Sequence, residues 1–285
     1  MTEPPQEVHG ILDAMLPPAM ASACEAAGAT KANRDAITLL VLGLLAGAFI
    51  AFGAIFMTVV LTGSNDLPWG LTRLLGGLAF SLGLILVVAG GAELFTGDAL
   101  MVVSYASGRI TLAALLRAWV LVYVGNIGGA LGTAVLAFLA GLYGFDNFGI
   151  AKTALAIASA KAALPTVQLF FLALLCNVLV CLAVWMSFGA RSMTDKIMVT
   201  VPPIAAFVAA GFEHSIANLY LLPYALAVKT WGGPGVWSAL GQNASGYTAL
   251  TVGAAVHNIL VATLGNLVGG SILVGAIYWF VYLRR

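Results

Sequence analysis

Two acidic motifs interrupt apolar stretches of the chain and hold the side chains best suited to chemistry. They span residues 91–98 and 211–218, and both fit the pattern G-x-E-x4-[D/N], with Glu93 and Glu213 at the same position. An ionisable side chain at the centre of a bilayer costs about 2.5–3.5 kcal/mol on insertion scales, so each glutamate needs a reason to be there. We expect both to support a helix break by hydrogen-bonding free backbone amides. Direct proton transfer is the alternative.

The second motif also contains His214, where the first has Leu94. Imidazole is the one side chain whose ordinary pKa, about 6.5, lies near physiological pH. Beside a helix break it could attract, hydrogen-bond or protonate a small anion in transit. A buried histidine with purely structural partners is the alternative.

Further polar side chains are candidates for the same path. We expect Thr96 to offer a hydroxyl, and Asn218 and Asn177 to offer amide donors. Lys161 could concentrate anions at an entrance, although it could equally be an ordinary interfacial lysine.

Aromatic side chains precede each break and could narrow the path. Phe80 and Phe207 occupy related places and could form apolar constrictions, or could simply be core aromatics. Moving a bare anion through an apolar neck is costly, and one histidine could not compensate several charges. We therefore expect a small monovalent solute.

The composition indicates what must position these residues. The chain has 285 residues, of which 61% are hydrophobic and 8% charged. Soluble domains average about 25% charged residues, so a polytopic membrane protein in a lipid bilayer is indicated. With 12 basic and 11 acidic residues, no nucleic-acid partner is suggested.

Charge-free stretches predict six transmembrane helices, of which the second and fifth are broken by the acidic motifs. The expected spans lie near residues 37–62, 74–108, 118–145, 162–190, 197–228 and 249–282. We expect a cytoplasmic segment at 1–36 with a short surface helix over 18–33, followed by a channel domain at 37–285. The excess of basic residues on the side of the N-terminus predicts that both termini are cytoplasmic.

A second repeated motif supports an internal repeat. Residues 125–129 (Gly-Asn-Ile-Gly-Gly) are echoed by 265–270 (Gly-Asn-Leu-Val-Gly-Gly), in the same order relative to the acidic motifs. Three spans per half is an odd number, so the halves, about 37–145 and 162–285, must be inverted. We expect the broken helices, with Gly91 and Gly211 at the breaks, to line the path. The Gly-Asn motifs, including Asn126 and Asn266, are interpreted as close helix packing.

With these motifs in view, the chain resembles the formate/nitrite transporter family, and especially its formate channels. The matching stretches are Phe80–Leu86, Glu93–Thr96, Val180–Ser187, Gly211–Asn218 and the closing Tyr282-Leu-Arg. The resemblance implies an aquaporin-like six-helix protomer in a homopentamer of the bacterial cytoplasmic (inner) membrane. Its cargo would be formate, with nitrite and other small monovalent anions possible.

The resemblance also assigns roles to individual residues. His214 would be the pore histidine, and Thr96 would lie on a loop that gates the path. Further positions follow from the same likeness. Lys161, Asn177 and Asn266 would lie near the histidine, and Phe80, Phe95 and Phe207 would form constrictions. Formate channels often have small uncharged residues after the threonine, whereas this chain reads Thr96-Gly97-Asp98.

Other functions receive less support from the sequence. A nitrite or hydrosulfide channel needs the same neck and histidine. An intramembrane hydrolase using Glu213 and His214 lacks an HExxH or GxSxG motif. A water or glycerol channel would need a selectivity arginine and Asn-Pro-Ala-like breaks. We therefore expect no enzymatic activity, no cofactor and no metal site.

Overall fold

The computed structural model describes residues 14–284, and within them the chain forms only helices and connecting turns. Six apolar helical stretches are long enough to cross a membrane. They are α2 (Ala36–Leu61), α3 (Trp69–Gly90), α6 (Leu112–Leu139), α8 (Thr166–Gly189), α9 (Met193–Ala210) and the last stretch, which contains α12 (Val252–Val268), the π-helix η5 (Gly269–Ala276) and α13 (Ile277–Tyr282). The all-helical, six-span expectation is confirmed.

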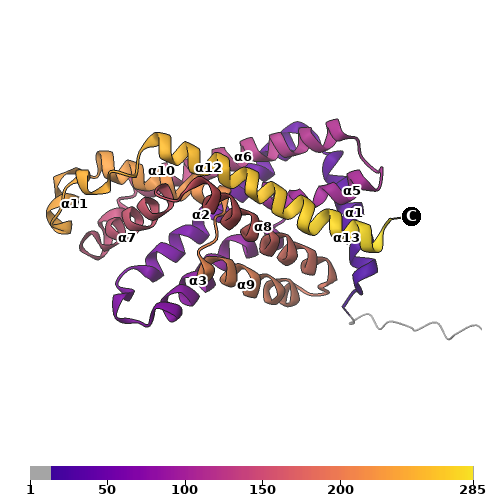
Figure 1. Cartoon of the computed structure of the whole chain (residues 1–285), viewed down its shortest axis with the longest axis horizontal. Helices are drawn as coiled ribbons and strands as arrows, with labels where there is room; N and C mark the ends of the chain where they lie inside the picture. Colours follow the sequence, from indigo (N-terminus) through magenta and orange to yellow (C-terminus); the bar gives the residue numbers. More distant parts are fainter. Residues whose placement is uncertain (1–13, 285) are drawn as a thin grey trace, which may run out of the picture.

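Shorter helices complete the chain. They are α1 (Pro17–Ala32), α4 (Phe95–Asp98), η2 (Ala99–Met101), α5 (Val102–Ala106), α7 (Phe145–Ala162), α10 (Ser215–Trp231) and α11 (Gly233–Leu240), with single turns η1 (Ser64–Asp66), η3 (Leu142–Gly144) and η4 (Ala244–Tyr247). In Figure 1, α7 and α11 lie at one end of the long axis, and α1, α5 and α13 lie at the other.

Polar caps define where several helices begin. Asp35 precedes α2 and accepts hydrogen bonds from the Thr38 hydroxyl and amide, which hold the pKa of this carboxyl below its usual value. Thr111 and Thr251 cap α6 and α12 in the same way. Such caps satisfy amide groups that have no partner within the helix.

The third span begins earlier than expected. It starts at Leu112 instead of 118, because the helix includes the exposed Arg117, whose guanidinium donates to the Arg34 carbonyl. A long cationic side chain at a helix end can reach polar surroundings without ending the helix. The expected surface helix at 18–33 corresponds to α1. Of the expected 1–36 segment, residues 1–13 lie outside the described part of the chain.

Both acidic motifs begin where a long helix stops. Gly91 follows α3 with φ 76°, and Gly211 follows α9 with φ 77°, a left-handed conformation that favours glycine. The next amides, of Ala92 and Phe212, donate to the carbonyls of Val87 and Phe207, each at 3.0 Å. The two helices therefore end in the same glycine cap, and α4 and α10 begin after short non-helical loops.

The Gly-Asn motifs bring helices into close contact. A Cβ atom on Gly129 of α6 would collide with the Leu44 carbonyl of α2, and one on Gly269 would collide with the Leu174 carbonyl of α8. Small residues at such positions let transmembrane helices approach closely. The two halves thus use glycine at matching helix contacts.

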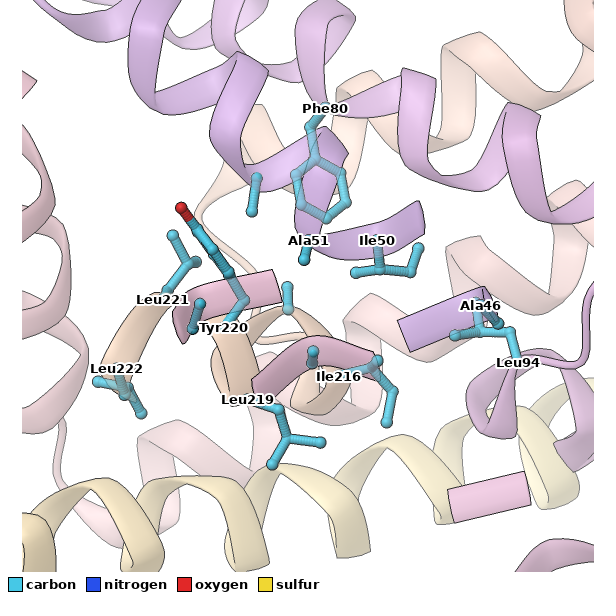
Figure 2. Close-up of a cluster of buried hydrophobic side chains, with 14 of the residues drawn as sticks. Ala46, Ile50, Ala51, Phe80, Leu94, Ile216, Leu219, Tyr220, Leu221 and Leu222 are labelled. Carbon is cyan, nitrogen blue, oxygen red and sulfur yellow. The ribbon is translucent and has the colours of Figure 1, made fainter. Parts of the chain in front are cut away.

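Apolar side chains fill the region between the two breaks. Figure 2 shows Ile50 of α2, Phe80 of α3 and Leu94 of the first break gathered with Ile216 and Tyr220 of α10. Each of these side chains is buried. This packing fixes the helices that hold the polar residues described below.

Candidate functional site: two helix breaks at the base of a vestibule

A buried asparagine holds each break open. In the first, Asn126 accepts a hydrogen bond from the Phe95 amide at 2.9 Å and donates to the carbonyls of Gly43 at 2.8 Å and Glu93 at 3.0 Å. The side chain is fully buried. One amide group therefore ties α2, the loop and the start of α4 together.

Asn266 makes the same three contacts in the second break. It accepts from the Ser215 amide at 2.9 Å and donates to the carbonyls of Ala173 at 2.7 Å and Glu213 at 2.9 Å. The expectation that these asparagines serve only helix packing is therefore too narrow. They satisfy the backbone groups that the breaks set free.

The glutamates do not bond the freed amides, contrary to our expectation. The Glu213 carboxylate accepts from Lys161 at 2.8 Å and from Asn218 at 2.7 Å. Asn258 contacts both partners. Its Oδ1 accepts from Asn218 at 2.7 Å, and its Nδ2 donates to the Glu213 carboxylate at 3.5 Å. The ammonium and the amides compensate the charge of Glu213, a residue that is 3% exposed.

The first break has a larger charged cluster. Glu93 pairs with Lys31, at 2.6 Å, and with Arg34, both from the N-terminal region. Lys31 also contacts Asp98 at 2.6 Å. Burial lowers the pKa of Lys31, but the carboxylates of Asp98 and Glu93 outweigh that effect and raise the pKa above its usual value. The cluster therefore holds α1 against the broken span.

His214 meets Thr96 between the two breaks. The imidazole Nδ1 accepts from the Ala217 amide at 3.1 Å and so caps α10. The Nε2 atom lies 3.1 Å from the Thr96 hydroxyl oxygen. Since Nδ1 is an acceptor, a neutral ring carries its proton on Nε2 and donates to Thr96. The geometry thus fixes which ring nitrogen can offer a proton.

A cavity of about 270 Å³, which we call the vestibule, ends at His214. Phe80 and Phe207 also line it, and their rings meet edge to face with centroids 5.6 Å apart. The ring of Phe207 stacks on His214 at 5.9 Å. The remaining lining residues include Arg73, Lys161, Gly211 and Glu213. Two aromatic rings and the imidazole therefore share this cavity with Arg73, Lys161 and Glu213.

Other predicted site residues lie close by but with different contacts. Both amide hydrogens of Asn177 are engaged, by the carbonyls of Thr96 at 3.0 Å and Asn266 at 2.6 Å. Those of Asn218 are engaged by Glu213 and Asn258. Neither amide has a free hydrogen to offer a solute in this structure. Phe95 packs against Tyr123, with centroids 4.8 Å apart, and does not line the vestibule.

Sequence reasoning missed several polar partners. The sequence uses Lys31, Arg34 and Arg73 only as charges that set the orientation, and it gives no role to Asn258. An asparagine inside an apolar span is itself a signal, since it is costly without partners. Across residues 14–284, no cluster of three or more His, Cys, Asp or Glu side chains could hold a metal ion.

The fold and site define a multi-span membrane protein in which two helix breaks meet at a polar contact beside two aromatic rings. That arrangement is typical of transporters and channels rather than of hydrolases. The sequence description of the formate/nitrite transporters matches residues 18–280, and the chain belongs to this family.

Known relatives agree over nearly the whole chain. The chain is 42% identical to "Formate channel FocA" of Escherichia coli over 274 residues, 96% of each protein. It is 40% identical to the Haemophilus influenzae protein of the same name over 86% of this chain and 87% of that one. A solved structure described as "Pentameric formate channel with formate bound" matches with a TM-score of 0.83 and 44% identity, covering 87% of this chain and 98% of that chain. These relatives are channels, not enzymes, and together with the six spans they indicate a multi-pass inner-membrane protein.

Proposed function

We propose that this protein conducts formate and similar small monovalent anions across the inner membrane. The observation that carries the proposal is the contact of Thr96 with His214, which lines the vestibule. It supplies one N–H and one O–H donor beside the apolar rings of Phe80 and Phe207. The named relatives, one of them solved with formate bound, support the same cargo.

In this proposal His214 acts in its neutral form. The Ala217 amide already donates to Nδ1, so protonation of that nitrogen would lose a helix cap. A formate carboxylate that enters between His214 and Thr96 accepts from Nε2–H and Oγ1–H in place of the bond between them. These charge-assisted bonds replace part of the hydration that the anion loses in the neck.

The asparagines and glutamates then serve as positioning residues. Asn126 and Asn266 hold the loops that present Thr96 and His214. Lys161 and Lys31 neutralise the two glutamates, so the breaks add little net charge of their own. Asn177 and Asn218 act on this framework rather than on the solute.

The wider organisation belongs to the same proposal. The matching caps, asparagine contacts and glycine contacts of the two halves support an inverted repeat over about 37–145 and 162–285. The solved relative, described as pentameric, supports a homopentamer. We expect one path in each protomer. Both termini would be cytoplasmic, which places the vestibule on the outer side.

Flux measurements in liposomes that contain the purified protein test this function. Formate, nitrite, hydrosulfide and acetate are compared at two pH values, with protein-free liposomes as the control. We expect formate to pass faster than acetate, since the neck admits only small anions. Nitrite or hydrosulfide passing much faster than formate would reassign the cargo. Equal permeability with and without protein would refute the channel.

A further inference from the structure

Arg73 is a vestibule residue for which the site described above has no role. It lies in the first turns of α3, half-buried, and lines the same cavity as Lys161, Glu213 and His214. We propose that Arg73, rather than Lys161, is the cation that draws anions into this mouth of the channel. The inference rests on the proposed function and names a residue that determines its charge specificity.

The charge balance of the vestibule supports this assignment. Lys161 lies 2.8 Å from the Glu213 carboxylate, so the two charges largely cancel at a distance. In the part of the chain that the structure describes, Arg73 has no carboxylate within salt-bridge distance. Its polar partners are carbonyl groups. The net positive charge of the lining therefore comes from Arg73, and a positively charged cleft raises the local concentration of anions.

The end of α9 gives Arg73 a second effect on anions. Its Nε donates to the Ala209 carbonyl at 3.0 Å and its Nη2 to the Val208 carbonyl at 2.7 Å. These are among the last carbonyls of the helix, and a helix C-terminus carries about half a negative charge. Without a cation there, the helix end would repel an entering anion. The guanidinium replaces that repulsion by attraction.

Gly211 leaves room for the Arg73 guanidinium at the end of α9. Gly211 has a left-handed φ, and a Cβ atom at this position would lie 3.0 Å from Arg73 Nη2. A larger residue would therefore crowd the guanidinium.

At the other end of the molecule the arrangement of cations differs. When the two acidic motifs are aligned, the position equivalent to Arg73 is Met193. The cations near the first break are Lys31 and Arg34 instead. Those cations are paired with Glu93 and Asp98, so among the residues that the structure describes the first repeat has no counterpart of the unpaired Arg73.

Formate flux through right-side-out and inside-out membrane vesicles tests the role of Arg73. The host lacks other formate channels, and flux is measured at low and high ionic strength. At low ionic strength, we expect Arg73→Gln to raise the half-saturating formate concentration about 3- to 10-fold from the vestibule side. Maximal flux and half-saturation from the opposite side should change little. The difference should shrink in high salt, because salt screens the charge.

Two substitutions separate charge from fold. Arg73→Lys keeps the charge and should restore most of the wild-type half-saturation. Lys152→Gln removes a cation from the exposed surface of α7, outside the vestibule lining, and should change nothing. A wild-type half-saturation in Arg73→Gln would overturn the inference, as would failure of Arg73→Lys to restore it. Absence of formate flux in the wild-type protein would instead overturn the proposed function.

A further pair keeps the test decisive if Arg73→Gln does not assemble. Ala160 is an exposed residue of the vestibule lining. Ala160→Glu adds a negative charge to the vestibule without removing the bonds of Arg73, and should also raise the half-saturating concentration. Ala160→Gln, which adds similar bulk without charge, should not. Equal behaviour of the two variants would overturn the proposed charge effect.

Discussion

Removing Asn266 should destabilise the protein strongly, because one side chain satisfies three buried backbone groups. Asn266→Ala would leave the Ser215 amide and the carbonyls of Ala173 and Glu213 without this partner. At about 0.6 kcal/mol for each bond, the mean for membrane helices, the loss is about 2 kcal/mol. At about 2 kcal/mol for each group left unsatisfied, it reaches about 6 kcal/mol. Either figure is large beside a typical stability of about 5–15 kcal/mol.

Thermal unfolding of the detergent-solubilised protein, followed by fluorescence and by size-exclusion chromatography, measures the loss. Asn126→Ala should give a loss in the same range, since Asn126 makes the same three contacts. Asn266→Leu fills the volume without making the bonds and should be as damaging as alanine. Asn243→Ala, at an exposed position, is the matched control and should unfold like the wild type.

Two results would refute this reasoning. If Asn266→Leu unfolded at the wild-type temperature, packing volume rather than hydrogen bonding would hold the break. If Asn266→Ala were damaging and Asn126→Ala harmless, the two breaks would not share a scaffold, despite their matching contacts.

Three further predictions concern the polar contact and the charged cluster. His214→Ala should reduce formate flux while the oligomer still assembles, because the variant lacks the Nε2–H donor; unchanged flux in liposomes would refute the role of the histidine. Thr96→Val should slow formate flux roughly 10- to 150-fold, because one bond to a charged group is worth about 1.5–3 kcal/mol, and Thr96→Ser should keep most of the flux. Equal flux in the two threonine variants would show that the hydroxyl is not used. Asp98→Asn should loosen α1, since it removes the carboxylate 2.6 Å from Lys31; this is measured as faster hydrogen exchange of the α1 amides, and unchanged exchange would argue against the contact.

The positions of the helix breaks could be predicted because they depend on local sequence. A glycine followed closely by an acid inside an apolar stretch ends a helix in both halves, and the structure has Gly91 and Gly211 in the left-handed conformation that this requires. The repeated order of the motifs also indicated which spans would carry the breaks. Local patterns of this kind survive folding because they set backbone dihedral angles directly.

The partners of the buried charges could not be predicted in the same way. Lys31 and Arg34 lie far from Glu93 in the sequence, and only the docking of α1 brings them together. Arg73 reaches the end of α9 for a similar reason, since no pattern in α3 indicates which carbonyls it will face. Lys161 could be expected at an entrance, but nothing near it in the sequence reveals its pairing with Glu213.

The two halves share a framework but not their reactive groups. Asn126 and Asn266 make equivalent bonds, and Glu93 and Glu213 each meet a lysine. The groups that we propose to meet the anion differ between the halves. The first motif supplies only the hydroxyl of Thr96, and the second only the imidazole of His214, which lies 3.1 Å from it. A symmetric pair of histidines would put two titratable rings in one apolar neck, where a charge on either would repel a charge on the other. A single ring opposite a hydroxyl gives an anion two donors without that penalty. The asparagine and glutamate contacts can therefore be repeated in both halves. The histidine is best present once, opposite a hydroxyl.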